Sequence, residues 1–328
     1  CTILLVTTAL SGTYEEHYKW TELFGEFGLL LDGLATPFAI MIYVLCTILA
    51  LYSKPYMIHL FKENFEKITH LNGAKETTRG SQTTAVVESS SLQTHVNNQS
   101  GLYYALYLVF SMGMLGTVLA TNLIEFYIFF EVMLIPSFFL IALYGAGPRR
   151  RIALMFFFWT HVGAVVLLLG FLTIGLSVGS FDFADINESE IPPDIVMISA
   201  IAIAIGLGVK LAVFMFHVWL PYVHGSAPTP ISALLSPAMI GIGAYGIFRL
   251  IIEFLPMTFA DLSIWFHIWG LVTMIYGGAM ALMQDDLKRM LAYSSISQMG
   301  YILFGIGSIS VLGLAGAEMM YVTHAIGK

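Results

Sequence analysis

The sequence predicts an all-α polytopic membrane protein, in which several helices cross the bilayer. Hydrophobic residues make up 58% of the 328 residues and charged residues only 11%, and the mean hydropathy is +0.82. Soluble domains carry about 25% charged residues, so a large soluble core does not explain this composition. Several apolar segments also reach about 20 residues without a charge, which is the length of a helix that spans the hydrocarbon core.

The apolar segments divide the chain into a series of expected spans. Residues 1–10 resemble the end of a helix, and residues 11–32 form a connection with room for a short interfacial helix at residues 18–31. The expected full spans are residues 32–52, 102–119, 123–144, 152–178, 195–220, 231–255, 262–283, 291–307 and 311 to the end. Short connections predict antiparallel neighbours, and the frequent Gly and Ala favour close helix contact within a membrane.

Residues 53–100 differ in composition from the rest of the chain. They are rich in Lys, Glu, Thr, Ser and Asn, with a low-complexity tract at residues 77–99, and are predicted to form a flexible loop outside the membrane. By parity, residues 148–151 (PRRR) and 285–289 (DDLKR) lie on the same side as this loop, and residues 180–194 on the other. The positive-inside rule makes the basic side the cytoplasmic or matrix side.

The ends, the cysteines and the missing motifs limit the possible functions. The chain starts at Cys1 within an apolar run and stops at Lys328 in a helical context, so we expect both ends of a longer chain to be missing. Cys1 and Cys46 have no metal-ligand spacing, which predicts neither a disulfide framework nor a metal site. A basic patch interleaved with aromatic residues, a phosphate-binding glycine loop and a CxxC cluster are absent from the sequence, so nucleic-acid binding and redox chemistry are not expected of this chain.

Glu131 and Lys210 each stand alone as an ionisable residue in an apolar span. Such residues are costly within a membrane and usually mark ion pathways. Burial favours their neutral forms, whereas mutual attraction favours their charged forms, so a pair at an adjustable distance can load and release a proton. We expect the two side chains to approach within several ångströms near mid-membrane. The alternative is a fixed buried ion pair that only positions helices.

Several histidines lie in or beside the same spans. His217 and His224 flank the Trp219-Leu220-Pro221 sequence; they either exchange protons near neutral pH or hydrogen-bond the loop backbone. His161 and His267 lie deep in apolar segments, where a buried and satisfied polar group is the favoured interpretation. His324 and Lys328 are four residues apart and therefore share one helix face.

Three long motifs carry a family resemblance. They are VKLAVFMFHVWLP at residues 209–221, HGSAPTPISALL at residues 224–235 and QDDLKRMLAYSSISQMGY at residues 284–301. The sequence resembles the antiporter-like membrane subunits of respiratory complex I, and is most similar to the M type, also called chain 4. The L and N types and the Mrp cation antiporters share much of this pattern.

This resemblance implies an antiporter-like fold with inverted five-helix repeats, an arrangement that places ion sites near mid-membrane. Residues 1–52 would be N-terminal transmembrane helices, residues 53–100 a polar inner-side loop, residues 101–255 the first repeat and residues 256–328 a truncated second repeat. Glu131 and Lys210 match the family's key glutamate and lysine. His217, His224, His324 and Lys328 are the further candidates for proton transfer.

The sequence departs from the family pattern at three positions. The prolines that usually follow the lysine are replaced by Ala212 and Met215, so the expected helix break lacks its usual cause. Gly206 and Gly208 could loosen the helix instead. M-type chains often carry a lysine where this sequence has Gly241, so ordered water would have to bridge a relay from Lys210.

By resemblance, the chain is a proton-translocating subunit of the membrane arm of complex I or a close relative, an NADH:quinone oxidoreductase-type complex. It would hold no cofactor; iron-sulfur clusters, flavin and quinone would lie in partner subunits. The expected partners are the L- and N-type chains and the lipid bilayer, in a prokaryotic plasma membrane or the mitochondrial inner membrane. The alternatives are a subunit of an Mrp-type cation/proton antiporter and a passive structural membrane subunit.

Overall fold

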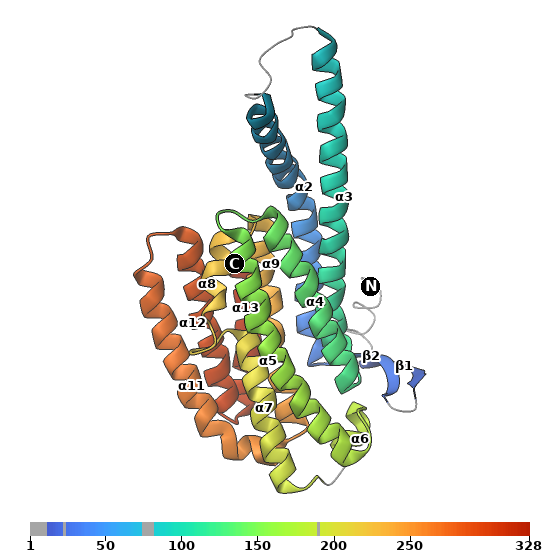
Figure 1. Cartoon of the computed structure of the whole chain (residues 1–328). Helices are drawn as coiled ribbons and strands as arrows, with labels where there is room; N and C mark the ends of the chain where they lie inside the picture. Colours follow the sequence, from blue (N-terminus) through green and yellow to red (C-terminus); the bar gives the residue numbers. More distant parts are fainter. Residues whose placement is uncertain (1–11, 22–23, 74–81, 189–190) are drawn as a thin grey trace.

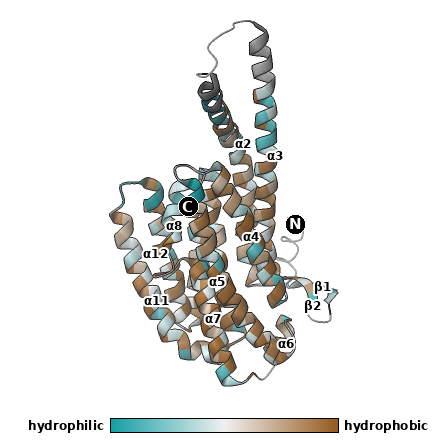
Figure 2. Ribbon diagram, viewed as in Figure 1, coloured by the Kyte–Doolittle hydropathy of each residue, from teal (hydrophilic) through white to brown (hydrophobic). Residues whose placement is uncertain are grey.

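Helices dominate the structure, as the apolar composition predicts. The computed structural model describes residues 12–21, 24–73, 82–188 and 191–328, and Figure 1 shows them as a helical bundle with one small hairpin at its side. Within this described part, seven helical segments are long and apolar enough to cross a membrane. Hydrophobic residues cover much of their length (Figure 2). The chain is therefore an integral membrane protein with an all-helical membrane region.

A β-hairpin precedes the first long helix. Strand β1 (Tyr14–Thr21) pairs antiparallel with strand β2 (Gly25–Leu31). The prediction of a short interfacial helix at residues 18–31 is therefore wrong. Gly25 begins β2 with a φ of +79°, a conformation that glycine adopts at little cost in a tight turn. Aromatic and β-branched residues in these segments favour strands, and the strand pairing satisfies the backbone.

Helices α2 (Ala35–Gly73) and α3 (Gln82–Leu119) project together beyond the bundle (Figure 1). The prediction that residues 53–100 form a flexible loop is thus wrong for residues 53–73 and 82–100, whereas residues 74–81 lie outside the described part. Local contacts support the helical extensions. Lys67 pairs with Glu63 one turn earlier at 2.6 Å, and the Tyr103 hydroxyl donates to Ser53 Oγ at 2.9 Å.

The first half of the bundle continues with α4 (Leu123–Tyr144), α5 (Arg149–Val178), α6 (Phe183–Glu188) and α7 (Pro193–Leu211). Asn122 begins α4 by accepting a hydrogen bond from the Ile124 N–H at 2.7 Å. Helices α5 and α7 approach so closely that a β-carbon on Gly206 would lie only 2.7 Å from the Gly163 carbonyl oxygen. Gly206 therefore serves helix packing, as small residues do in membrane interiors.

The span expected at residues 195–220 is broken. Helix α7 ends at Leu211, and the chain resumes a helix only at α8 (Trp219–Ser226). The next span is a continuous buried segment built from α9 (Thr229–Leu234), η1 (Leu235–Met239), α10 (Ile240–Ile247) and η2 (Phe248–Glu253). The two η segments are π-helical turns, which are rare and often occur at functional sites.

The second half contains α11 (Pro256–Leu282), α12 (Leu287–Gly307) and α13 (Val311–Gly327). Glycines bring α11 and α12 into backbone contact, since a β-carbon on Gly270 would lie 2.5 Å from the Phe304 nitrogen. The loops before α5 and α12 lie together, because Arg151 and Arg289 line one pocket. Helix α6 lies toward the opposite end (Figure 1). The basic loops therefore share one end of the bundle, as expected from parity.

Candidate functional site

The break after α7 forms without the usual prolines. Ala212 adopts a left-handed conformation with φ +54° and ψ +44°, and Met215 has a φ of +78°. Non-glycine residues seldom adopt this conformation, and such strain persists only where the surroundings enforce it. The Val213 N–H donates to the Gly208 carbonyl at 3.2 Å, which closes the end of α7. Left-handed backbone at Ala212 thus replaces proline as the local cause of the break.

Tryptophan side chains hold the irregular residues 212–218 in place. The indole N–H of Trp159 donates to the Phe216 carbonyl at 3.0 Å, and that of Trp269 donates to the Phe214 carbonyl at 3.0 Å. Trp219 donates to the Val209 carbonyl at 3.1 Å. Because hydrocarbon offers no water to unpaired backbone groups, such partners are required wherever a helix is interrupted within a membrane.

Lys210 occupies the last turn of α7, directly before the break. Lys210 is only 2% exposed, and Nζ is buried without a hydrogen-bond partner among the residues that the structure describes. Nζ lies 4.6 Å from the centroid of the Phe130 ring, a cation–π distance. The carbonyl end of the helix dipole also favours a cation at this position. The structure therefore places a buried amine at the end of a half-helix, with an aromatic ring as its main support.

Glu131 contacts His161 and not Lys210. Its Oε2 atom lies 3.1 Å from His161 Nδ1 on α5, whereas Oε1 is buried without a partner. Within the described residues, no ion pair of 4.0 Å or less joins Glu131 to Lys210. The two charges therefore form no direct ion pair, and Phe130, the neighbour of Glu131 on α4, contacts Lys210; their approach within several ångströms stays a prediction. The prediction that His161 is a buried and satisfied polar group is wrong as to burial, because its side chain is 42% exposed, although its ring is satisfied by the glutamate.

His217 and His224 lie on either side of the first turn of α8. His217 Nε2 is 3.1 Å from the Tyr276 hydroxyl on α11, and its Nδ1 is buried without a partner. His224 is also buried, and its Nε2 has no partner. Among the described residues, each of the two rings therefore has one nitrogen without a hydrogen-bond partner. That nitrogen could accept or donate a proton.

A small cavity connects His224 to the end of the chain. It measures about 110 Å³ and is lined by His224, Ser236, Lys288 and Lys328 among others. His324, one helical turn before Lys328, is buried and its Nε2 has no partner. Ser236 in η1 hydrogen-bonds Ser295 on α12 at 2.7 Å. The structure thus places His224 and Lys328 at one cavity, and His324 lies one turn before Lys328 on α13.

Gly241 has a packing role that its sequence context did not indicate. A β-carbon at this position would overlap the ring of Tyr321 on α13. Tyr321 is fully buried and stacks on Phe38 with ring centroids 4.2 Å apart. Its hydroxyl has no hydrogen-bond partner. A tyrosine ring therefore fills the space beside Gly241.

Sequence reasoning missed a buried charge cluster around Arg249. This side chain is 1% exposed, and its two terminal nitrogens lie 2.7 Å from Asp32 Oδ1 and 2.7 Å from Glu253 Oε2. Its Nε donates to the Tyr245 hydroxyl at 3.1 Å, and Tyr245 donates to the Val118 carbonyl at 2.7 Å. In the sequence, Tyr245, Arg249 and Glu253 follow one another at intervals of one helical turn, and this spacing could have revealed the cluster.

Together these features define a class of protein. A helix interrupted beside a buried lysine, in a bundle with unpaired buried histidines, is the architecture of ion-translocating membrane proteins with discontinuous helices. The chain belongs to the NADH:quinone oxidoreductase/Mrp antiporter transmembrane family, whose model matches residues 120–328.

Curated relatives agree with this family. The chain is 35% identical over 237 residues to NAD(P)H-quinone oxidoreductase chain 4 3 of Picosynechococcus sp., covering 70% of this chain and 42% of the relative. It is 34% identical over 226 residues to NADH-quinone oxidoreductase subunit M of Rickettsia bellii, covering 68% of this chain and 46% of the relative. The chain thus spans less than half the length of these relatives.

Solved structures share the fold. A chain of the Mrp complex from Dietzia sp. DQ12-45-1b superposes with a TM-score of 0.78 at 26% identity, over 98% of this chain and 32% of that one. A chain of respiratory complex I from Thermus thermophilus gives a TM-score of 0.78 at 22% identity, over 99% of this chain and 62% of that one. The predicted antiporter-like fold is confirmed.

Proposed function

We propose that this chain is a proton-translocating, antiporter-like subunit in the membrane arm of complex I or a close relative. Electron transfer takes place in other subunits, which hold the iron-sulfur clusters, flavin and quinone, and this chain couples it to proton movement. The names of the curated relatives support an NADH:quinone oxidoreductase-type complex. The proposed membrane is a prokaryotic plasma membrane or the mitochondrial inner membrane, with the L- and N-type chains as partners.

The observation that carries the proposal is the unpartnered, buried Nζ of Lys210 at the broken end of α7. A buried amine without a hydrogen-bond partner is costly when charged, so nearby charge strongly influences its protonation. Glu131 and His161 form the adjacent pair that can supply such a change. When Glu131 is charged, Lys210 retains its proton more readily; when Glu131 is neutral, the lysine releases it.

The remaining candidates extend a path away from Lys210. His217 follows the break and contacts Tyr276, and His224 shares the small cavity with Lys328. His324 belongs to the same region through its place on α13. We assign proton transfer between these groups to ordered water, because in the described part of the chain their ring nitrogens have open sites but do not contact one another.

A second candidate is a subunit of a multisubunit Mrp-type cation/proton antiporter. The observation that favours it is the 26% identity and near-complete coverage by a chain of the Dietzia Mrp complex. Purification of the native assembly separates the two readings. Flavin- and iron-sulfur-containing subunits that copurify with the chain support a complex I-type assembly, whereas exclusively small membrane subunits support the antiporter.

The proposal is tested with Glu131→Gln in the complete assembly, reconstituted into vesicles. We expect loss of the proton gradient formed per substrate oxidised, because the lysine then loses the neighbouring charge that controls it. Electron transfer should persist where coupling is not obligatory. A full proton gradient in the assembled variant would favour the passive structural reading.

A further inference from the structure

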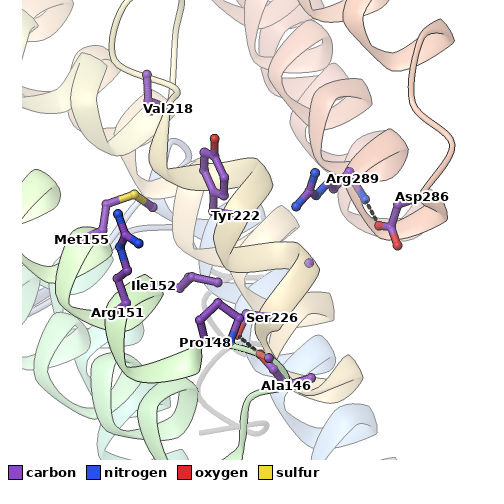
Figure 3. A pocket seen from close by; sticks show the side chains of 12 residues that line it. Ala146, Pro148, Arg151, Ile152, Met155, Val218, Tyr222, Ser226, Asp286 and Arg289 are labelled. Atoms are coloured by element: carbon purple, nitrogen blue, oxygen red, sulfur yellow. Dashed lines mark hydrogen bonds between the residues drawn. The ribbon is translucent and has the colours of Figure 1, made fainter.

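A pocket opens between α5, α8 and α12, at the end of the bundle that carries the basic loops (Figure 3). Its volume is about 750 Å³. Pro148 and Arg151 line one side, Asp286 and Arg289 line the other, and Tyr222 of α8 lies between them. None of the residues proposed for proton transfer lines this pocket, so it is a separate feature of the molecule.

Two arginines face the pocket from different helices. Figure 3 shows Arg151 extending from α5 and Arg289 from the start of α12. The Arg289 guanidinium lies 5.7 Å from the centroid of the Tyr222 ring. Among the residues that the structure describes, neither guanidinium takes part in a hydrogen bond or ion pair. Arginine presents a planar set of donors that matches phosphate oxygens, so two free guanidinium groups at one pocket favour a phosphate-containing ligand.

The surrounding charge is positive. Residues 148–151 contribute three arginines, whereas the two acids and two bases of residues 285–289 cancel. The one carboxylate in the pocket, Asp286, accepts a hydrogen bond from the Arg289 backbone N–H at 2.8 Å and so caps α12. Lys288 is engaged elsewhere, donating to the Ala227 carbonyl at 3.0 Å. The pocket therefore attracts anions.

Hydrogen bonds fix the shape of the pocket. The Ala146 N–H donates to the Ser226 carbonyl at 2.7 Å, and the Ser226 hydroxyl donates to the Ala146 carbonyl at 2.8 Å. These two bonds join the loop before α5 to the end of α8, and Figure 3 shows both residues beside Pro148. A preformed site loses little conformational entropy when it binds a ligand.

The wall of the pocket that lies toward the membrane interior is apolar. Ile152 and Met155 follow Arg151 along α5, and Val218 precedes α8. Val218 and Tyr222 are both exposed, so this wall opens to the surroundings of the bundle. A soluble phosphate gains nothing from such a wall, whereas a lipid places its headgroup at the arginines and its acyl chain on the apolar side chains.

We propose that this pocket binds the headgroup of an anionic phospholipid. Arg151 and Arg289 hold the phosphate oxygens, and the first acyl carbons rest on Ile152, Met155 and Val218. Basic pockets between transmembrane helices at the inner membrane surface commonly bind anionic headgroups.

The test uses the complete assembly in nanodiscs of neutral phosphatidylcholine. A photoactivatable phosphatidylglycerol with its diazirine near the glycerol backbone is added, and crosslinks to peptides that contain Met155 or Val218 are quantified. Loss of a charged hydrogen-bond partner typically weakens binding by about tenfold. We therefore expect Arg151→Gln and Arg289→Gln each to lower crosslinking by about that factor. Arg150→Gln is the matched control, since Arg150 is exposed on the same turn but does not line the pocket.

Three results would overturn the proposal. Equal losses in the Arg150→Gln and Arg151→Gln variants would indicate diffuse surface charge. Equal crosslinking by a labelled phosphatidylcholine would indicate an apolar groove without headgroup recognition, and full competition by inorganic phosphate would indicate a site for a soluble anion. If Arg289→Gln prevents assembly through its contact with Tyr222, Arg151→Gln decides the outcome alone, because the Arg151 side chain has no hydrogen-bond or ion-pair partner in the described part of the chain.

Discussion

Trp219 donates its indole N–H to the carbonyl oxygen of Val209 at 3.1 Å, and this bond joins the first turn of α8 to the last turn of α7. Lys210 follows Val209 directly, so the helix after the break helps to set the position of the buried amine. Trp219 is fully buried and packs against Phe156, with ring centroids 5.2 Å apart. The break is therefore an organised element of the fold, held by side chains from several helices.

Replacing Trp219 by Phe tests this connection. The variant loses one buried hydrogen bond, which costs about 0.5–1.5 kcal/mol, and leaves the Val209 carbonyl with only the longer bond from the Ala212 N–H at 3.3 Å. We expect a lower midpoint of thermal unfolding in detergent and slower proton transport. Trp265→Phe is the control, because Trp265 is exposed on α11. Equal melting of the two variants would show that the Trp219 bond does not support the break.

Met215→Gly tests the backbone strain at the break. Met215 has a φ of +78° and is 68% exposed, so its side chain contributes little buried area. Glycine adopts this conformation without the steric cost of a β-carbon, which is about 1 kcal/mol or more. We expect the variant to be more stable by about 1 kcal/mol in thermal unfolding, with Met215→Ala unchanged. A loss of stability would mean that the left-handed conformation is not strained.

The Glu131–His161 contact predicts a role for His161 in transport. Replacement of His161 by Leu removes the polar partner of Glu131 Oε2; because Oε1 also lacks a partner among the described residues, the carboxyl group is no longer held in position beside Lys210. We expect proton transport to decrease several-fold in the assembled complex, measured as acidification of reconstituted vesicles. His59→Leu, at an exposed position of α2, is the control. If His161→Leu transports protons at the rate of the control, His161 has a purely structural role.

The Arg249 cluster predicts an order of stabilities. Arg249→Met leaves the Asp32 carboxylate without its cation, and breaking a buried ion pair costs about 3–5 kcal/mol. Glu253→Gln should cost under about 1 kcal/mol, because the Glu253 side chain is 41% exposed. The yield of assembled complex on native gels, with thermal unfolding, measures both variants. Equal yields from the two variants would contradict the central position of Arg249 in this cluster.

Hydropathy predicted most of the membrane helices, but its limits are visible at residues 53–100. Polar composition indicates that a segment lies outside the membrane, but it does not indicate that the helix ends there. Glu63 and Lys67 form a helical ion pair in this stretch, and Glu, Lys and Gln are good helix formers. The β-hairpin was missed for a related reason, since alternation in two short segments is a weak signal.

The candidate residues Glu131 and Lys210 could be found because isolated charges in apolar spans are conspicuous. The contacts of these two residues could not be predicted from the sequence, because they involve Phe130 and His161, whose positions are set by helix rotation and packing. The break depends likewise on indole N–H groups from distant positions such as Trp269. Gly241 was interpreted as a gap in a relay, whereas it accommodates the ring of Tyr321 from a helix 80 residues away along the chain.

Lys210 is the group that we propose carries protons through this chain. The most direct test of this proposal is the number of protons translocated per electron in vesicles that contain the fully assembled Lys210→Met complex, with Lys62→Met on the exposed part of α2 as the control. Methionine preserves the apolar stem of the side chain but cannot be protonated, so the variant removes the proposed proton carrier at the end of α7. We expect a markedly lower proton-to-electron ratio for Lys210→Met with much of the electron transfer retained, and an unchanged ratio for the control. An unchanged ratio in assembled Lys210→Met would contradict this proposal.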